Sequence, residues 1–159
     1  MIKTGSNFIH VGQIHVDTEP ILISTVLGSC VAVCLYDKRV CVGGMNHYLL
    51  PFWNGNGLQS LKFGNISIPK LIESMIDKGA KSNTMEAKIF GGASINFSSC
   101  QTMMVGEKNI LVAREILNDY KIKIVAEDVG GNSGRKIQLN LEQGKVLLKY
   151  TAKSNFGDM

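Results

Sequence analysis

The fold is decided by the stretch Leu27-Gly28-Ser29-Cys30-Val31-Ala32-Val33-Cys34-Leu35-Tyr36, in which a short loop runs into an unbroken hydrophobic segment. The segment from Cys30 to Tyr36 is too short to span a bilayer, and its apolar and β-branched residues predict a strand. The polar residues Asp37-Lys38-Arg39 predict a turn, after which Val40 to Tyr48 resumes as strand. These residues together predict a β-hairpin.

Outward from this hairpin, the chain carries further strands and two helices. Ser67 is expected to cap a helix that has Pro69 in its first turn and Gly79 at its end, and Glu107 to Tyr120 predicts a second helix. Further strands are expected at Asn7 to Val16, Ile21 to Thr25, Ala87 to Phe90, Ile122 to Asp128, Arg135 to Leu141 and Lys145 to Tyr150. The sequence therefore predicts an α+β fold, with a mixed or mostly antiparallel sheet and two helices covering one face.

Length and composition indicate a single domain over residues 1–159. The chain has 159 residues, of which 45% are hydrophobic and 19% charged, which is enough apolar material for one core. No linker divides it, and the polar residues 151–159 are expected to form a frayed tail. Residues 52–64 are rich in glycine and asparagine and predict a surface loop that is long enough to be functional.

Targeting signals and charge narrow the class of protein. Residues 1–17 lack the apolar core of a signal peptide, and no segment is long enough for a membrane-spanning helix, so we expect a cytoplasmic protein without direct membrane insertion. The net charge of +4 is spread along the chain, in runs no longer than pairs such as Lys38-Arg39. Nucleic-acid binding is therefore not expected, because it usually needs a denser basic stripe.

The four cysteines, Cys30, Cys34, Cys41 and Cys100, are expected to be reduced thiols because no secretory signal precedes them. Cys34 and Cys41 fall inside the predicted hairpin strands, where a cysteine packs like a small hydrophobic residue. Zinc sites usually show two closely spaced ligand pairs, whereas only Cys30 and Cys34 lie close together in this sequence. No metal and no organic cofactor is expected.

Cys30 is the candidate nucleophile. It lies where a glycine-containing loop meets an apolar strand, so its thiol can be exposed while nearby backbone N–H groups point into the same space. The N–H groups of Ser29 and Cys30 are the candidate donors to an oxyanion. The competing interpretation is that Cys30 is a small buried hydrophobic residue, as most free cysteines are.

His47 is the candidate base, because the predicted hairpin brings it near Cys30. A turn at residues 37–39 pairs residues whose numbers sum to about 76 or 77, which sets Cys30 opposite Asn46 or His47. Directly opposed Cβ atoms lie ~5 Å apart, which suits a thiolate and imidazolium pair. A buried, hydrogen-bonded structural histidine would give the same pattern.

Ser24 and Thr25 supply two hydroxyls just before the nucleophile loop, and either could fix the tautomer of the imidazole. They face opposite ways in an extended strand, so only one of them can do so. His10 and His15 also face opposite sides of one predicted strand, which keeps them from joining a single site.

Four blocks of this sequence together resemble the CheD family of bacterial chemoreceptor glutamine deamidases. The first surrounds Cys30 (residues 27–33) and the second surrounds His47 (44–51). The third is Glu86-Ala87-Lys88-Ile89-Phe90-Gly91-Gly92-Ala93, and the fourth is Ala126-Glu127-Asp128-Val129-Gly130-Gly131-Asn132 followed by Gly134-Arg135. The blocks occur in the family's order, and the resemblance covers roughly residues 12–150.

The resemblance implies a cysteine amidohydrolase that converts glutamines of methyl-accepting chemotaxis receptors to glutamates. It implies Cys30 as nucleophile, His47 as base, and a third member six residues before the cysteine, where this chain has Ser24 in place of the family's usual threonine. The departure keeps the hydroxyl, and Thr25 beside it is the alternative. The implied fold is a β-sandwich flanked by helices, related to deamidating bacterial toxins, and the implied site is shallow, with loop 52–64 as its rim.

Two other functions stay open at this point. Family members also bind a CheC-type phosphatase, so the chain could act as a non-catalytic binding module. A thiol-redox role would need a resolving cysteine, for which Cys34 is the nearby candidate. The intact pair of Cys30 and His47 favours the enzyme.

Overall fold

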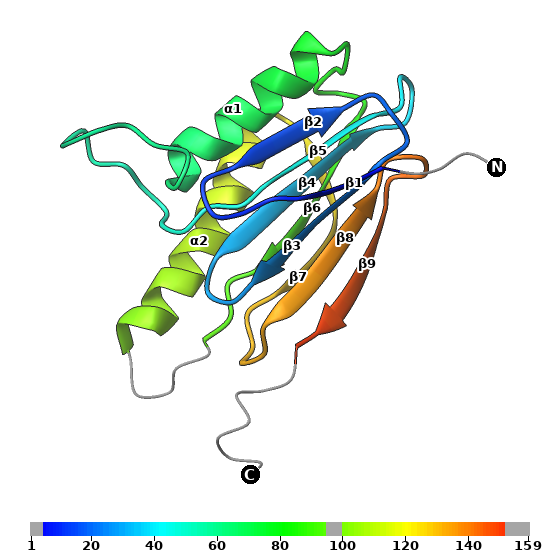
Figure 1. Ribbon diagram of the computed structural model, residues 1–159. Helices are drawn as coiled ribbons and strands as arrows, with labels where there is room; N and C mark the ends of the chain where they lie inside the picture. The colour runs from blue at the N-terminus through cyan, green and yellow to red at the C-terminus, as the bar shows by residue number, and fades with distance from the viewer. Residues whose placement is uncertain (1–4, 95–99, 152–159) are drawn as a thin grey trace.

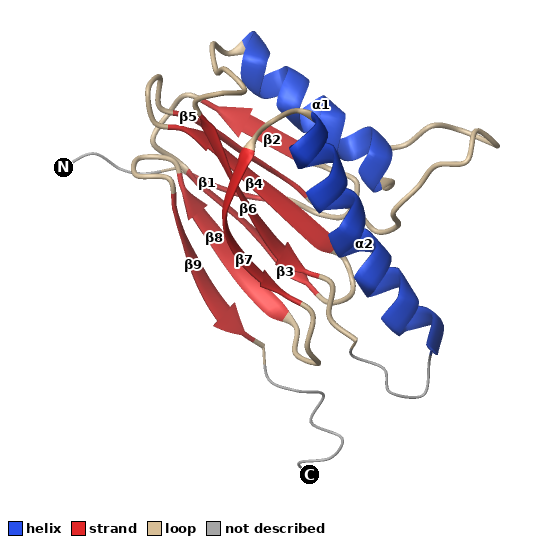
Figure 2. Cartoon of the chain, turned by 180° about the vertical axis from the view of Figure 1, so that it is seen from behind, coloured by secondary structure: helices blue, strands red, loops and turns tan. Residues whose placement is uncertain are grey.

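The protein is described here from a computed structural model that covers residues 5–94 and 100–151, without the side chains of residues 100–104. Two β-sheets and a pair of helices form three layers, with the helices on one outer face (Figure 1). The reverse view shows both helices crossing the same sheet (Figure 2). The expected α+β class, a mixed sandwich with two helices packed outside, is confirmed.

The described strands form one sheet of four and one of five. The four-stranded sheet has the order β1 (Ser6–Phe8), β3 (Leu22–Leu27), β8 (Arg135–Asn140), β9 (Lys145–Tyr150). The five-stranded sheet has the order β2 (Ile14–Asp17), β5 (Val42–Asn46), β4 (Val31–Asp37), β6 (Met85–Gly91), β7 (Lys123–Val129). The β1–β3 and β6–β7 pairs are parallel and the other pairs are antiparallel.

Strand β4 lies in the middle of the five-stranded sheet and is buried on both faces. Val31, Val33 and Leu35 join the hydrophobic cluster beneath the helices, whereas Ala32 and Cys34 join the cluster between the two sheets. Successive side chains of a strand point to opposite faces, so a strand between two cores needs hydrophobic residues at every position. This explains the unbroken hydrophobic run in the sequence.

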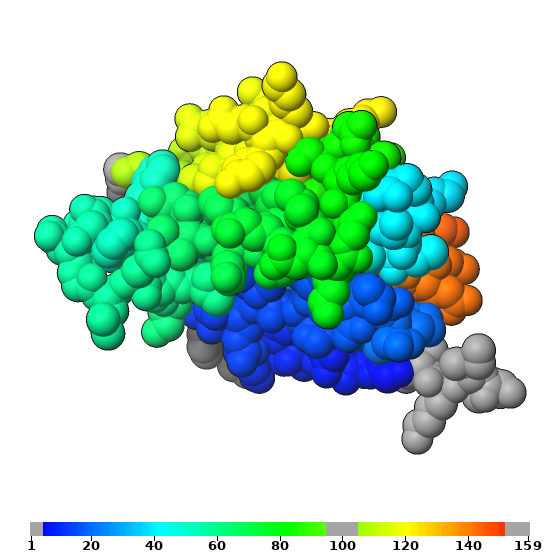
Figure 3. Space-filling view, turned by 90° about the horizontal axis from the view of Figure 1, so that it is seen from above, coloured from blue at the N-terminus to red at the C-terminus, as the bar shows by residue number. Residues whose placement is uncertain are grey.

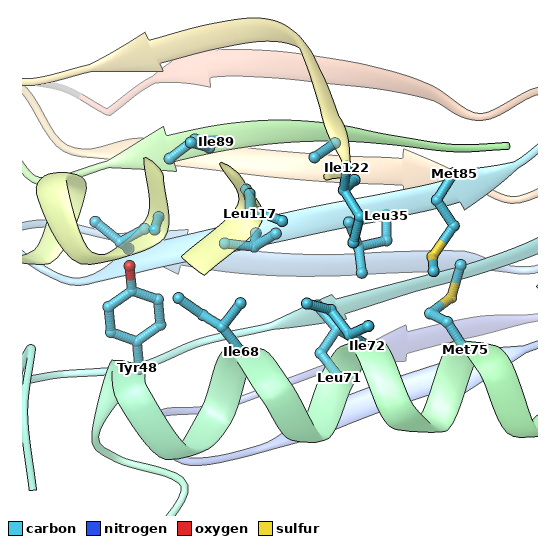
Figure 4. Close-up of a cluster of buried hydrophobic side chains, with 14 of the residues drawn as sticks. Leu35, Tyr48, Ile68, Leu71, Ile72, Met75, Met85, Ile89, Leu117 and Ile122 are labelled. Atoms are coloured by element: carbon cyan, nitrogen blue, oxygen red, sulfur yellow. The ribbon is translucent and has the colours of Figure 1, made fainter. Parts of the chain in front are cut away.

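Helices α1 (Gly64–Asp77) and α2 (Cys100–Asp119) cover the five-stranded sheet. Side chains of α1 such as Ile68, Leu71 and Met75 point toward the sheet and α2 (Figure 4). Helix α1 starts earlier than expected, with Phe63 at its N-cap position. Ser67 therefore lies inside the helix, where its hydroxyl accepts a hydrogen bond of 2.9 Å from the side-chain amide of Asn46.

The hairpin of β4 and β5 forms, but its register differs from the predicted one. Cys34 pairs with Met45 and Asp37 with Val42, so the connection takes four residues instead of three. Cys41 lies in this connection with φ of 54° and its side chain is exposed. The expected burial of Cys41 is therefore wrong, while Cys34 is buried as expected.

The segment expected as one strand from Asn7 to Val16 is split between the sheets. Its first part is β1 and its last part is β2, on different sheets. The long loop before α1 extends from the body of the protein (Figure 3), and its Leu58 is 91% exposed. Within the described ranges, no helix is long and apolar enough to cross a membrane.

Candidate active site

The nucleophile loop, residues 28–30, joins β3 of one sheet to β4 of the other. The N–H of Gly92 donates to the carbonyl of Cys30 at 2.8 Å, and the N–H of Ala93 donates to that of Gly28 at 3.0 Å. Gly91 has φ of 107°, and a Cβ there would lie 2.2 Å from the Cys30 oxygen. Only glycine fits so close to the loop, which explains the Gly91-Gly92 pair in the sequence.

The second glycine-rich stretch, residues 130–135, supports the same region from the other side. The N–H of Gly130 donates to the carbonyl of Gly91 at 2.9 Å. Arg135 is 4% exposed, and its guanidinium bonds the Asp128 carboxylate and the Gly130 carbonyl, each at 2.8 Å. Hydrogen bonds from Arg135 and to Gly91 therefore hold this stretch against the region of the nucleophile loop.

Cys30 is half-buried at the start of β4 and packs against the cluster between the sheets. Burial raises the pKa of its thiol to about 11, although its own backbone N–H lowers that value slightly. The thiol is therefore protonated near neutral pH. Both Cys30 and His47 are described, and no hydrogen bond joins them in this structure.

His47 follows β5, and its ring faces the gap between the two sheets. Val31 and Tyr48 form an antiparallel bridge, so Cys30 falls opposite Leu49 and diagonal to His47. Direct opposition of Cys30 and His47, as the sequence predicts, is therefore wrong. Diagonal neighbours still share a face and lie roughly 7 to 8 Å apart, within reach of a side-chain rotation.

Thr25 contacts the imidazole and determines its tautomer. Its Oγ1 lies 2.8 Å from the carbonyl oxygen of Ile9 and 2.7 Å from His47 Nδ1. The carbonyl can only accept, so the single hydroxyl proton of Thr25 is donated to Ile9. The hydroxyl oxygen must then accept from Nδ1–H, which leaves the lone pair of His47 on Nε2.

The Nε2 atom of His47 is buried and has no hydrogen-bond partner in the part of the chain that the structure describes. Burial, with a smaller contribution from the charge of His10, lowers the pKa of His47 to about 4. The imidazole is therefore neutral at neutral pH. A neutral ring with a free Nε2 lone pair on the face shared with Cys30 has the form that a general base requires.

Ser24 does not make the contact that was expected of it. Thr25 shares the inward face of β3 with Ile23 and Leu27, and the side chain of Ser24 points to the opposite face. Among the two open candidates, the structure thus places Thr25 against His47. His10 and His15 also lie outside this cluster, and His15 Nε2 bonds Asp17 at 3.1 Å instead.

The backbone N–H groups of Ser29 and Cys30 donate to no backbone carbonyl within the residues described. The opposite side of the Ser29–Cys30 peptide is occupied, since the carbonyl of Ser29 accepts from the side chain of Asn109 at 3.1 Å. Free N–H groups beside a nucleophile are the groups that an oxyanion site needs.

Two groups of this site were missed by sequence reasoning. The Ile9 carbonyl belongs to the backbone and leaves no signal in the sequence, and Asn109 is a single polar residue on the buried side of a predicted helix.

As for a metal, the described residues contain no cluster of three or more histidine, cysteine or acidic side chains. The side chain of Cys100 lies outside the part that is described.

Comparison with known proteins gives consistent matches. The family model described as CheD chemotactic sensory transduction matches residues 49–150. A protein of Sulfurimonas denitrificans, named probable chemoreceptor glutamine deamidase CheD, is 55% identical over 94% of this chain and 96% of its own length. A protein of Trichlorobacter lovleyi with the same name is 48% identical over 93% and 92%. The chemoreceptor glutamine deamidase CheD of Thermotoga maritima is 40% identical over 89% of each chain.

Proposed function

The chain belongs to the CheD family, and from this premise we propose that it is a cysteine amidohydrolase that deamidates glutamine side chains of methyl-accepting chemotaxis receptors. The product is glutamate, and ammonia is released. The observation that carries the catalytic assignment is the hydrogen bond between Thr25 and His47, because it leaves a free Nε2 lone pair facing the side of Cys30. The receptor region acted on is the cytoplasmic coiled coil, so the proposal also assigns the protein to the cytoplasm.

In the first step, Cys30 Sγ attacks the side-chain carbonyl carbon of the glutamine. The pKa of the thiol is raised to about 11 and that of the imidazole is lowered to about 4, so the resting pair is neutral. The proton therefore passes from sulfur to His47 Nε2 as the carbon–sulfur bond forms. The N–H groups of Ser29 and Cys30 donate to the oxyanion that develops on the carbonyl oxygen.

In the second step, the tetrahedral intermediate collapses to a thioester. His47 returns its proton to the departing nitrogen, and ammonia leaves. Neutral His47 then takes a proton from water, and the resulting hydroxide attacks the thioester carbon. Collapse of this second intermediate releases glutamate and restores the Cys30 thiol, with the proton returning from His47 to sulfur.

Thr25 acts on this cycle through His47. When the ring becomes an imidazolium, its Nδ1–H still donates to the Thr25 hydroxyl, which in turn donates to the Ile9 carbonyl. This chain of bonds keeps Nε2 directed to one side while its proton is exchanged. Thr25 is therefore assigned as a positioning residue, in place of Ser24.

The test is conversion of glutamine to glutamate in a receptor cytoplasmic fragment, followed by mass spectrometry and by release of ammonia. We expect conversion by the wild type and none above background by Cys30→Ala or His47→Ala. Circular dichroism of each variant serves as the control for folding. A wild type that converts no glutamine but binds a CheC-type phosphatase tightly would favour the binding module over the enzyme.

A further inference from the structure

Asn109 of α2 is fully buried and holds two loops of the site at once. Its side-chain nitrogen lies 3.1 Å from the carbonyl oxygen of Ser29 and 2.9 Å from that of Leu49. Carbonyl oxygens only accept, so the amide must present its NH₂ group to both of them. Asn109 thus connects the loop of the nucleophile to the segment two residues after His47.

The bond to Ser29 also orients the next N–H group. The carbonyl of Ser29 and the N–H of Cys30 belong to one planar trans peptide and point in opposite directions. When Asn109 draws the oxygen toward α2, the Cys30 N–H is directed away from the helix. A donor on the carbonyl further polarises the peptide and strengthens its N–H as a donor.

A second contact anchors Asn109 itself. The hydroxyl of Tyr48 donates to the backbone carbonyl of Asn109 at 2.5 Å, and Figure 4 shows this hydroxyl pointing toward α2. Tyr48 directly follows His47 in the sequence. The helix, the base and the nucleophile loop are therefore joined through one residue.

Only one end of the Asn109 side-chain amide is paired. Its side-chain oxygen Oδ1 is buried and has no hydrogen-bond partner among the described residues. An unpaired buried acceptor destabilises the folded state, so the benefit of the asparagine comes from its NH₂ group, without which the carbonyls of Ser29 and Leu49 would lose this donor. The two bonds made by the NH₂ group remain as the reason for the residue.

We propose that Asn109 is a positioning residue that holds the Cys30 N–H in place for the oxyanion formed during deamidation. The proposal rests on the function proposed above. It requires that loss of the Asn109 amide weaken reactions of Cys30 that pass through an oxyanion, and leave its other reactions nearly unchanged.

Two reagents distinguish the reactions of Cys30 that pass through an oxyanion from those that do not. p-Nitrophenyl acetate transfers its acetyl group to Cys30 Sγ through a tetrahedral oxyanion and releases p-nitrophenolate. Iodoacetamide alkylates the same sulfur by displacement of iodide, without an oxyanion. Both products are measured on the peptide that contains Cys30 by mass spectrometry, with the exposed Cys41 of the same molecule as internal standard.

We expect Asn109→Ala to lower the acetylation rate of Cys30 by about tenfold or more, since lost oxyanion stabilisation has effects of at least that order. Its alkylation rate should stay within about twofold of wild type. Asn109→Ser keeps one donor, so its acetylation rate should lie between those of wild type and Asn109→Ala. It replaces the alanine variant in the test if that variant folds poorly. Tyr48→Phe removes the hydrogen bond that anchors Asn109 but keeps the bond to Ser29, so it should lower acetylation less than Asn109→Ala does.

Equal losses with both reagents would show that Asn109 only supports the fold, and an acetylation rate equal to that of wild type would show that it does not act on the oxyanion; either result overturns the proposal. Neither reagent is a receptor. A wild type that failed to deamidate receptors would therefore contradict the proposed function, but it would not decide how Asn109 affects the acetylation and alkylation rates of Cys30.

Discussion

The two ends of strand β4 bury polar groups in opposite ways. At its C-terminal end, the Asp37 carboxylate is completely buried and accepts from Thr84 Oγ1 at 2.6 Å and from the N–H groups of Lys81 and Arg39, each at 3.0 Å. Near its N-terminal end, His47 Nε2 is buried and has no hydrogen-bond partner within the residues described. One end of the strand satisfies its polar atoms, whereas the other leaves a lone pair free.

The pKa values reflect this difference. Burial acts on Asp37 to raise its pKa, but the hydrogen bonds from Thr84, Lys81 and Arg39 outweigh it and the net pKa is lowered. At the other end burial dominates, so it raises the pKa of Cys30 and lowers that of His47. Hydrogen-bond donors keep the buried Asp37 carboxylate charged, whereas without such partners burial keeps Cys30 and His47 neutral. We infer that the Asp37 end serves stability and the Cys30 end serves chemistry.

The largest expected effect is on catalysis at the Cys30 end. Cys30→Ala should lower receptor deamidation by on the order of 10³-fold or more, because the nucleophile is lost. The free energy of unfolding should change by less than about 1 kcal/mol, because the side chain is only half-buried. Mass spectrometry of the receptor fragment and urea denaturation measure the two quantities. Large destabilisation with residual activity would contradict the comparison.

The Asp37 end should respond in the opposite way. Asp37→Ala should lower the free energy of unfolding by about 3 kcal/mol, because it strands several buried donors. Deamidation per folded molecule should stay within about twofold, since the site is at the other end of β4. Because the folded pKa of Asp37 is lowered, its stabilising contribution is present above pH 3.8 and is lost as the pH falls through the folded value. Urea denaturation at pH 7 and pH 3 measures the change in stability and its dependence on pH, and the receptor assay measures deamidation.

His47 should give stability a second dependence on pH, in a higher range. Its folded pKa of about 4 lies below the ordinary histidine value of 6.5, so between these values the unfolded chain binds a proton that the folded chain does not. Stability should therefore be highest above pH 6.5 and fall by up to about 3 kcal/mol as the pH drops to about 4. The comparison is urea denaturation of wild type and His47→Gln across this range. Parallel curves for the two proteins would show that His47 titrates normally.

The smallest expected effect separates the two adjacent hydroxyls of β3. Thr25→Val should lower deamidation by roughly tenfold, because it removes the oxygen that accepts from His47 Nδ1. Thr25→Ser should retain most of the activity, and Ser24→Ala should retain nearly all of it. Initial rates with the receptor fragment rank the three variants. The reverse ranking, with Ser24 essential and Thr25 dispensable, would place the wrong hydroxyl on the imidazole.

The elements of the fold were predictable because hydrophobic patterns and turn residues mark them. The hairpin of β8 and β9 lies close to its expected position, and both helices end near their expected residues, although α1 begins at Gly64 and α2 at Cys100, earlier than expected. The register of β4 and β5 was not predictable, since their connection uses Cys41 in a left-handed backbone conformation that cysteine seldom adopts. A change in the length of the turn then shifts every cross-strand pair.

The candidate site was predictable in part for a related reason. The loop and the hairpin bring Cys30 and His47 to one face even in the shifted register. The choice between Ser24 and Thr25 was open because both faces of β3 carry apolar residues, Leu22 and Val26 on one and Ile23 and Leu27 on the other. Only the placement of the second sheet determines which face is inward, and that placement depends on contacts far apart in the sequence.

The central position of β4 also has a consequence for hydrogen exchange. Amide protons exchange slowly where a strand is flanked on both edges and covered on both faces, since exchange there requires global unfolding. Strand β4 meets these conditions, with β5 and β6 at its edges and a hydrophobic cluster on each face. We therefore expect its amides to be among the slowest to exchange and those of the loop before α1 to be among the fastest. The nucleophile is thus attached to the cooperative unit that opens last, so the surface can fluctuate locally without displacing the sulfur.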